Sequence, residues 1–462
     1  MIYLDHAAAT PVSKRALEAM MPYFREEFFN PSAAYLPAKK VAAEYETAKK
    51  TIAQAIGAKS ADLVITAGAT EANNLAFTAL SARSDFCDPK FPTGPAATFP
   101  PFSSSSMGGP QVASPVGSPR AVVSVSDGQS EDLLRSGSRR SRPSPWGERA
   151  NPRAAALRDP LHRSKSSLLY LETEHPSVLE VAKAYGGTAV KVLSSGVIDL
   201  NDLKAKITDE TEMISVAAVN NELGTIQPLA EIAEIIREVK LERMKKGLKR
   251  QLLFHSDASQ ALNLLDLSVA RLGVDLLTLN SAKVYGPKGV GALYVSHEAR
   301  LRPLTVGGGQ EKGLRSGTEN VPGVIGFAEA VKETKEHLNG NRKKYRELKR
   351  ILLTELQGYE LINKKHTLDN FVVLCYNGLD AERLIFLLEE HGVYVATGAA
   401  CAASKGEKSR TLKAIGLTDA EIAGSLRLSL GATNDVEQMR EAARIINAVV
   451  AQEKARLGYV AG

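Results

Sequence analysis

Short apolar segments alternate with longer amphipathic segments through most of this chain, and that alternation limits the possible folds more than any other feature. DLVIT, MISVAAVNN and DLLTLNSAKVYG have the length and apolar content of buried strands. Between them lie segments such as LAEIAEIIREVKLERMKKG, in which apolar residues recur at helical spacing. Strands that alternate with helices build a mostly parallel sheet covered on both faces. We therefore predict an α/β fold, a three-layer sandwich with a mostly parallel sheet.

The two ends of the chain add helices and a second region. Near the N-terminus, SKRALEAMMPYFREEF is predicted to form one helix and PAKKVAAEYETAKKTIAQAIGA a second. After about residue 298, helical KETKEHLNGNRKKYRELKRILLTEL is followed by strand-like NFVVLCYNG and VYVATG and by a long helix from about Asp435. This pattern predicts a smaller α+β C-terminal domain. We predict an N-terminal segment over 1–15 that packs with the small domain, a large domain over 16–298, and a small domain over 299–462.

One segment of the predicted large domain breaks the alternation. Residues 82–165 are rich in Ser, Pro, Gly and Arg and have no sustained apolar period. Such a stretch cannot bury enough apolar area to offset its ordering entropy, so we predict a disordered surface insertion. It contains twelve Lys and Arg against seven Asp and Glu, and so carries most of the net charge of +6. A solvated linker is favoured over an arm that binds nucleic acid or accepts phosphate. A translated intron or an assembly artefact would produce the same pattern.

Composition excludes several classes of protein. The chain is 44% hydrophobic, and no apolar run approaches the roughly 18 residues of a membrane helix. The opening MIYLDHAAATP lacks the basic start and apolar stretch of a signal peptide, so we expect a cytoplasmic protein that does not engage a membrane. Cys87, Cys375 and Cys401 are odd in number and widely spaced, which fits neither a disulfide framework nor a CxxC metal site.

A glycine turn after the first strand of the large domain indicates a phosphate site. DLVIT leads into GATEANNLAFTAL, so Gly68 opens a helix directly after a strand. The free N–H groups and the positive dipole end of such a helix favour an anion above the strand. Ala69 and Thr70 lie in the first turn of this helix.

Lys283 and Asp257 come at the ends of successive predicted strands. Lys283 in SAKVYGPKG precedes a glycine-rich turn, and Asp257 in HSDASQ ends the neighbouring strand. A lysine that forms a Schiff base and an aspartate that keeps a pyridinium nitrogen protonated are the signature of pyridoxal phosphate. Either residue alone is more often an ordinary solvated charge.

The motifs of this chain resemble a known family. YLDHAAATP, FNPSA, GATEANNLA, TEHPSVL, VNNELGTIQP, HSDASQA, SAKVYGPKG, GGGQEKGLRSGTENV, ATGAACAAS and SLRLSLG occur in the order seen in group I cysteine desulfurases. These belong to the class V aminotransferase family, within fold type I of the pyridoxal-phosphate enzymes. The resemblance covers nearly the whole chain except the insertion. It implies that residues 16–298 bind the cofactor and that the small domain carries a mobile loop around Cys401.

The resemblance also implies a role for each site residue. Lys283 would form the internal aldimine and later move protons, and His175 would stack on the cofactor ring and assist acid–base steps. Asp257 would pair with the ring nitrogen and Gln260 with the phenolic oxygen. The remaining cofactor contacts would come from Ala69, Thr70, Asn221, Asn280, Ser281 and, across a homodimer interface, Thr318. Arg427, aided by Asn221, would bind the substrate carboxylate.

Cys401 distinguishes among the reactions of this family. It lies in a small-residue segment, AACAASKGEKSR, and a thiolate on a mobile loop could reach the cofactor. A bare thiol among small apolar residues is also typical of a buried core position. The resemblance implies that Cys401 attacks the sulfur of the bound cysteine and becomes a persulfide, leaving alanine. Cys87, in the insertion, and Cys375, in an apolar strand, are poor candidates for the nucleophile.

The predicted function is that of a cysteine desulfurase, which supplies sulfur to an iron–sulfur scaffold, to tRNA thiolation, or to both. Two alternatives remain open at this point. A selenocysteine lyase or another class V transaminase or lyase would keep the cofactor but not the role of Cys401. A non-catalytic partner protein would retain only the fold.

Two positions differ from the usual family pattern. Asn280, Ser281 and Ala282 precede Lys283 where Ser-Gly-His or Ser-Ala-His is usual, so one imidazole donor to the phosphate is missing, and Asn280 or Ser281 would compensate. Tyr35 stands where a histidine is common.

Overall fold

The computed structural model describes residues 1–80, 167–397 and 408–458, which belong to one compact unit. The insertion predicted over 82–165 and the segment containing Cys401 lie outside the described residues. No helix in these described ranges is long and apolar enough to cross a membrane.

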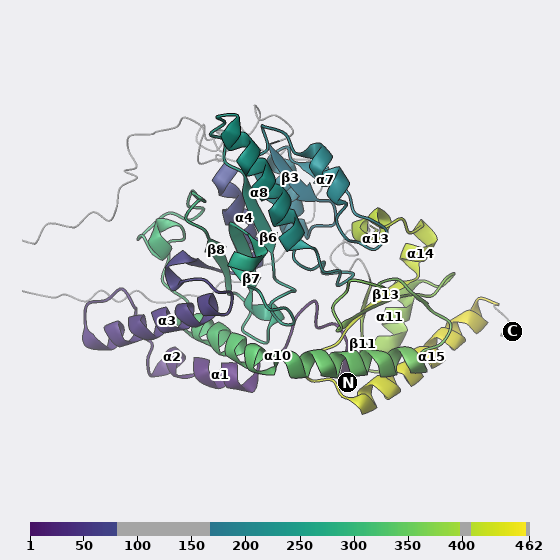
Figure 1. Cartoon of the computed structure of the whole chain (residues 1–462). Helices are drawn as coiled ribbons and strands as arrows, with labels where there is room; N and C mark the ends of the chain where they lie inside the picture. Colours follow the sequence, from purple (N-terminus) through teal and green to yellow (C-terminus); the bar gives the residue numbers. More distant parts are fainter. Residues whose placement is uncertain (81–166, 398–407, 459–462) are drawn as a thin grey trace, which may run out of the picture. The chain divides into compact units, whose positions relative to one another are not determined.

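A seven-stranded sheet forms the centre of the larger part of the structure (Figure 1). Its strand order is β2-β8-β7-β6-β5-β3-β4; the strands β7, β6, β5, β3 and β4 run parallel, whereas β8 is antiparallel to both neighbours. The strands are β2 (Leu63–Thr66), β3 (Leu168–Leu171), β4 (Thr188–Val190), β5 (Met213–Ser215), β6 (Leu253–Asp257), β7 (Leu276–Asn280) and β8 (Gly291–Val295). The predicted mostly parallel sheet is confirmed.

Helices cover both faces of this sheet, because alternate strand residues point to opposite sides. One face packs on α4 (Ala69–Phe77) and α6 (Pro176–Ala184), through Leu253 and Leu276 among others. The opposite face packs on α3 (Leu36–Gln54) and α8 (Leu229–Lys245), through Phe254 and Leu277. The further helices of this part are α7 (Leu200–Lys206) and α9 (Val269–Leu272). The three predicted layers are therefore present.

The N-terminal helix differs from the prediction. The segment predicted as one helix forms α1 (Lys14–Met20) and a separate short α2 (Pro22–Arg25). Pro22 lacks the backbone N–H that would continue the helical hydrogen bonds, so α1 ends before it although the backbone of Met21 is still helical.

A second sheet lies in the C-terminal part of the chain and is antiparallel throughout. Its order is β12-β13-β10-β9, and the separate strands β1 and β11 pair in parallel. The strands are β1 (Ile2–Tyr3), β9 (Glu360–Leu361), β10 (Phe371–Cys375), β11 (Val393–Tyr394), β12 (Ala396–Thr397) and β13 (Ser425–Ser429). The helices are α11 (Ala381–Glu390), α13 (Arg410–Ala414), α14 (Asp419–Ala423) and α15 (Val436–Arg456). This region has the predicted α+β character.

One long helix connects the two regions. The helix α10 (Val321–Glu355) contacts α1 and α3 near its start and α15 farther along, as Figure 1 shows. It begins eleven residues before the predicted helical segment, at a Pro in its first turn with the Asn320 side chain as N-cap. The N-terminal segment pairs with β11 and bridges Asp5 to Ser429 on β13. The division into domains at residues 15 and 298 stays a prediction.

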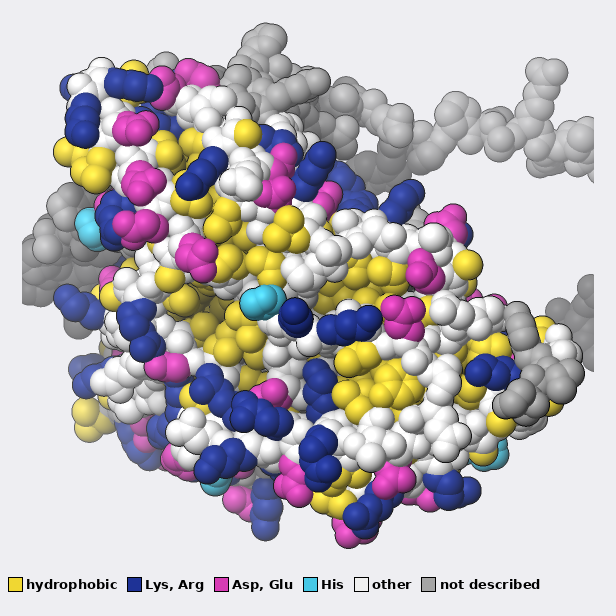
Figure 2. All heavy atoms as spheres, turned by 45° about the vertical axis from the view of Figure 1, so that its right-hand side comes forward, with side chains coloured by type: hydrophobic (Ala, Val, Ile, Leu, Met, Phe, Trp, Pro, Cys, Tyr) yellow, Lys and Arg dark blue, Asp and Glu magenta, His cyan; other side chains and the backbone are white. Residues whose placement is uncertain are grey.

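Charged side chains of both signs are interspersed over the face shown in Figure 2, with hydrophobic side chains between them. On this face the Lys and Arg side chains therefore do not form a single basic stripe. A surface of this kind is ordinary for a globular protein.

Candidate active site

The N-terminal segment brings two predicted cofactor residues together. Lys283 ends the short 3₁₀-helix Ser281–Lys283 directly after β7, and its Nζ donates to the carbonyl oxygens of Ala7, at 2.7 Å, and Ala8. The Nε2 of Gln260 donates to the same Ala7 oxygen at 2.9 Å. The residues that the sequence placed in separate motifs, HAAAT, HSDASQ and SAKVYG, thus meet at one point.

Asp257 lies at the carboxyl end of β6, next to β7, as predicted. Its side chain is buried and accepts two hydrogen bonds, from the Nδ2 of Asn73 at 2.8 Å and from the backbone N–H of Ser259 at 2.9 Å. Asn73 is on α4 and was not singled out from the sequence, although it stands inside GATEANNLA. Two donors fix the orientation of this carboxylate.

The same Asn73 connects Asp257 to His175. Its Nδ2 also donates to the Oγ of Ser177 at 2.9 Å, and that Oγ lies 2.9 Å from the Nδ1 of His175. His175 is the N-cap of α6, where its Nδ1 accepts from the N–H of Ser177 at 3.1 Å. The proton of the neutral imidazole therefore resides on Nε2.

Burial keeps His175 neutral near pH 7. Removal from water lowers the pKa of His175; Asp257 opposes this shift, and the positive charge of Lys283 adds to it. The preceding residue, Glu174, is also buried, and burial together with the charge of Asp257 raises its pKa to about 8, against hydrogen bonds from Ala217 and His175. Glu174 thus stays protonated at neutral pH.

The N-terminal end of α4 forms an open cradle beside Lys283, Asp257 and His175. Its N-cap is Gly68 at φ 146°, and no side chain from the described part of the chain caps the helix. A Cβ on Gly291 would lie 2.6 Å from the carbonyl carbon of Gly68, so only glycine lets β8 approach this turn so closely. The buried Oγ of Ser281 has no hydrogen-bond partner among the described residues. Unused donors of this kind suit a phosphate group.

The other predicted cradle residues have mixed surroundings. Ala69 is buried and Thr70 is exposed, both in the first turn of α4. The Oδ1 of Asn280 accepts from the N–H of Ala282 at 3.1 Å, so this side chain caps the turn before Lys283.

Arg427 lies on β13 and is 4% exposed. Its guanidinium donates to the backbone oxygen of Asn221 at 2.9 Å and to the Oδ1 of Asp5 at 2.6 Å. The structure therefore brings Arg427 and Asn221 together as the resemblance implied, although through the backbone of Asn221. Asp5 was missed by sequence reasoning, and its only signal was its place in the quoted motif YLDHAAATP.

A buried ion pair holds the loop that contains Thr318. Glu311 accepts from the Nζ of Lys49 at 2.9 Å, the hydroxyl of Tyr45 at 2.7 Å and the N–H of Ile65 at 2.9 Å. Thr318 is exposed on this chain, and its contact across a dimer stays a prediction.

Of the three cysteines, the structure describes Cys375 alone. Cys401 and Cys87 lie outside the described residues. Cys375 is buried in β10, where burial raises the pKa of its thiol, and its Sγ contacts Asn377 and the carbonyl of Glu421. A buried thiol of raised pKa is a poor nucleophile.

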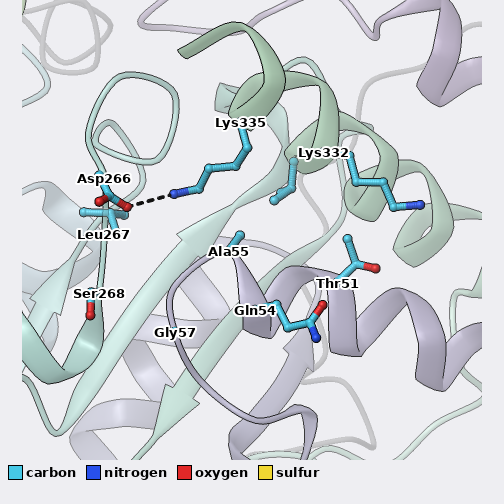
Figure 3. A pocket seen from close by; sticks show the side chains of 10 residues that line it. Thr51, Gln54, Ala55, Gly57, Asp266, Leu267, Ser268, Lys332 and Lys335 are labelled. Carbon is cyan, nitrogen blue, oxygen red and sulfur yellow. Dashed lines mark hydrogen bonds and ion pairs between the residues drawn. The ribbon is translucent and has the colours of Figure 1, made fainter. Parts of the chain in front are cut away.

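A cavity of about 410 Å³ lies away from all of these residues. It is bordered by α3, α10 and residues 266–268, and Lys335 pairs with Asp266 at its edge (Figure 3). It shares no residue with the predicted site.

Comparisons with known proteins show the family of this chain. The aminotransferase class-V family model matches residues 2–88 and 147–441 and leaves 89–146, inside the predicted insertion, unmatched. A cysteine desulfurase IscS 1 of Archaeoglobus fulgidus is 30% identical over 459 residues, 97% of each chain. Among solved structures, a NifS-like protein is 25% identical with a TM-score of 0.74 over 98% of this chain and 99% of its own. SspA in complex with cysteine is 27% identical with a TM-score of 0.65 over 93% and 99%. The chain therefore belongs to the aminotransferase class-V family, among its cysteine desulfurases.

Proposed function

We propose that this protein converts L-cysteine to L-alanine and transfers the sulfur to Cys401 as a persulfide. The observation that carries the proposal is the convergence of Lys283, Asp257, His175 and an uncapped helix N-terminus at one edge of the parallel sheet, in a chain of the cysteine desulfurase family. The carboxyl ends of parallel strands are the usual place for a ligand in such sheets.

The residues present fit pyridoxal 5′-phosphate. The buried, unpartnered Oγ of Ser281 and the free N-terminus of α4 would hold its phosphate, together with Ala69, Thr70 and Asn280. Asp257 would pair with the ring nitrogen, Gln260 with the phenolic oxygen, and Lys283 would bind the aldehyde carbon. When bound, the group supplies an electron sink for the electrons of substrate bonds at Cα.

The protein's own groups would then orient the substrate and move protons. Lys283 would carry a proton between its Nζ and the substrate, because its amine lies at the edge of the site. His175 would exchange a proton at Nε2, since Nδ1 is already occupied by Ser177. Arg427 would bind the cysteine carboxylate, and Asn221 holds the guanidinium through its carbonyl group.

The sulfur transfer balances without an external oxidant. The Cβ–S bond of cysteine breaks, an S–S bond to Cys401 forms, and the thiol proton of Cys401 is matched by the proton gained at the alanine methyl group. The carbon is reduced by two electrons, and each of the two sulfur atoms is oxidised by one. Alanine and an enzyme persulfide are the products.

The physiological setting is part of the same proposal. A homodimer with Thr318 reaching the partner's site, a cytoplasmic location and delivery of sulfur to an iron–sulfur scaffold or a tRNA-thiolation acceptor follow from the family resemblance. One of the similar solved structures is SspA in complex with cysteine, which supports cysteine as the substrate.

The test uses the purified full chain reconstituted with the cofactor. Addition of cysteine and a reductant should release alanine and sulfide in equal amounts, and Cys401→Ala should abolish the persulfide while the cofactor's absorbance is kept. A wild type that releases neither product refutes the proposal. Equal product formation by wild type and Cys401→Ala would instead assign a lyase reaction in which Cys401 is not used, as in a selenocysteine lyase.

A further inference from the structure

Glu222 links two segments that the sequence keeps far apart. It follows Asn221 in VNNELG, and its carboxylate accepts from the Oγ of Ser409 and, at 2.9 Å, from the Oγ1 of Thr411. Ser409 also caps α13 by accepting from the N–H of Leu412 at 3.0 Å. Both hydroxyl residues are almost fully buried and Glu222 is half-buried, so these hydrogen bonds are partly shielded from water.

The carboxylate is placed in an environment that opposes its charge. Burial raises the pKa of Glu222, against hydrogen bonds from Ser409 and Thr411 and the nearby charge of Arg427. Hydrogen bonds to both oxygens of this half-buried carboxylate offset part of that cost.

This contact sits beside Arg427. The carbonyl of Asn221, the residue before Glu222, accepts from the guanidinium of Arg427 at 2.9 Å. On the other side, β12 pairs with β13 so that Ala396 is opposite Arg427 and Thr397 is opposite Leu426. The chain is therefore fixed next to Arg427 both before residue 398 and after residue 407.

Cys401 lies between these two attachment points in the sequence. It follows Thr397 by four residues and precedes Ser409 by eight. Covalent connectivity means that the position of Ser409 limits where the cysteine thiol can go.

We propose that Glu222 is a positioning residue for sulfur transfer: it holds Ser409 and Thr411, and thereby fixes the end of the Cys401 segment beside the arginine that would bind the substrate carboxylate. The inference rests on the proposed function, because the step that it assists is cleavage of the cysteine Cβ–S bond with formation of the S–S bond to Cys401. Glu222 acts through Ser409 and touches neither the substrate nor the cofactor.

The surrounding packing allows the proposal to be tested by shortening the Glu222 side chain to alanine. Leu223 and Leu412 belong to one small apolar cluster with Val373, Ile415 and Ile422. This cluster should keep α13 folded when the Glu222 carboxylate is removed, so that Glu222→Ala reports on the hydrogen bonds themselves.

The experiment measures three quantities in the reconstituted full chain: the rate of persulfide formation, the affinity for cysteine and the hydrogen exchange of the segment after Cys401. In Glu222→Ala, the single-turnover rate of persulfide formation on Cys401 should fall about tenfold or more, as for a misplaced reacting group. Cysteine affinity, followed by the change in cofactor absorbance, should stay within about twofold. Hydrogen exchange in a peptide spanning 408–417 should rise. Thr411→Val, which removes one hydroxyl donor, should give an intermediate rate.

Glu421→Ala is the matched control, because Glu421 caps the neighbouring helix α14 and does not contact Glu222. It should leave the persulfide rate unchanged. A wild-type persulfide rate in Glu222→Ala overturns the inference, and so does a loss confined to cysteine affinity. If the wild type itself forms no persulfide, the proposed function is wrong and this inference fails with it. If the wild type forms persulfide and Glu222→Ala forms it at the same rate, this inference alone is overturned.

Discussion

Removal of the Glu311 carboxylate should destabilise the fold far more than removal of an exposed charge. The side chains of Glu311 and Lys49 are 5% and 7% exposed, and their Oε2 and Nζ atoms are 2.9 Å apart. Glu311→Ala leaves Lys49 as a buried charge without its partner, which costs about 3–5 kcal/mol. Tyr45 and Ile65 lose an acceptor as well, and these losses overlap with the first instead of adding to it.

The local backbone gives a reason why this anchor is needed. Glu311 and Lys312 have φ values of 46° and 60°, in the left-handed region that non-glycine residues rarely adopt. Contacts must compensate the strain of such a turn, of order 1–3 kcal/mol per residue. The Glu311 carboxylate supplies them from α3 and β2, and thereby holds the loop that contains Thr318.

Thermal unfolding of the cofactor-free protein measures the effect. With an unfolding entropy of about 2.1 cal/mol/K per residue, a loss of about 4 kcal/mol corresponds to a Tm lower by about 5 °C for a unit of this size. Glu180→Gln, which removes an exposed partner of Lys183, should leave Tm unchanged.

The double variant Lys49→Met/Glu311→Gln distinguishes a buried charge from simple loss of contacts. It removes both charges while the glutamine oxygen still accepts from Tyr45, so it should recover more than half of the lost Tm. If Glu311→Ala lowers Tm by less than 1 °C, or if the double variant is less stable than Glu311→Ala, the reasoning about this pair is refuted.

Four other measurements test the site. His255 is buried in β6, two residues before Asp257, and burial lowers its pKa to about 4 from 6.5. Between pH 6.5 and 4 the unfolded state therefore binds more protons, and the free energy of unfolding should fall by up to about 3 kcal/mol as the pH falls. Denaturant unfolding of His255→Gln should show a smaller fall. Glu174 changes stability with pH in the opposite direction. Its carboxyl group keeps its proton to about pH 8 in the folded state, whereas in the unfolded state it loses the proton near pH 4.5. Stability should therefore fall as the pH rises through that window, and Glu174→Gln should be more stable than wild type at pH 8 but not at pH 4.5. Asn73→Ala leaves one oxygen of Asp257 without its donor and should weaken cofactor binding about tenfold in an absorbance titration; an unchanged Kd would contradict the role of Asn73. Arg427→Lys cannot contact both Asp5 and the Asn221 carbonyl, so KM for cysteine should rise at least tenfold while the cofactor's absorbance stays normal.

Local sequence patterns were enough to predict which residues would meet at the edge of the parallel sheet. Asp257 ends β6 and Lys283 follows the end of β7 by three residues, and successive parallel strands place their carboxyl ends at the same edge of a sheet. Gly68 at a strand-to-helix turn predicted a phosphate cradle for a similar reason. Pattern also located the long helices, but it merged α1 with α2 and began α10 too late, because helical periodicity is a weak guide to boundaries at proline.

Only the tertiary structure decided which side chains support those groups. The Asn73–Ser177–His175 connection and the Asp5–Arg427 ion pair join residues separated by about one hundred and by more than four hundred positions. Periodicity and turn signals describe neighbours along the chain, whereas these contacts depend on how separate strands and helices pack. The sequence by itself therefore determined the parallel sheet and predicted which residues meet at its edge. Packing alone determined that Asn73 orients Asp257 and that Glu222 holds the chain beyond Cys401.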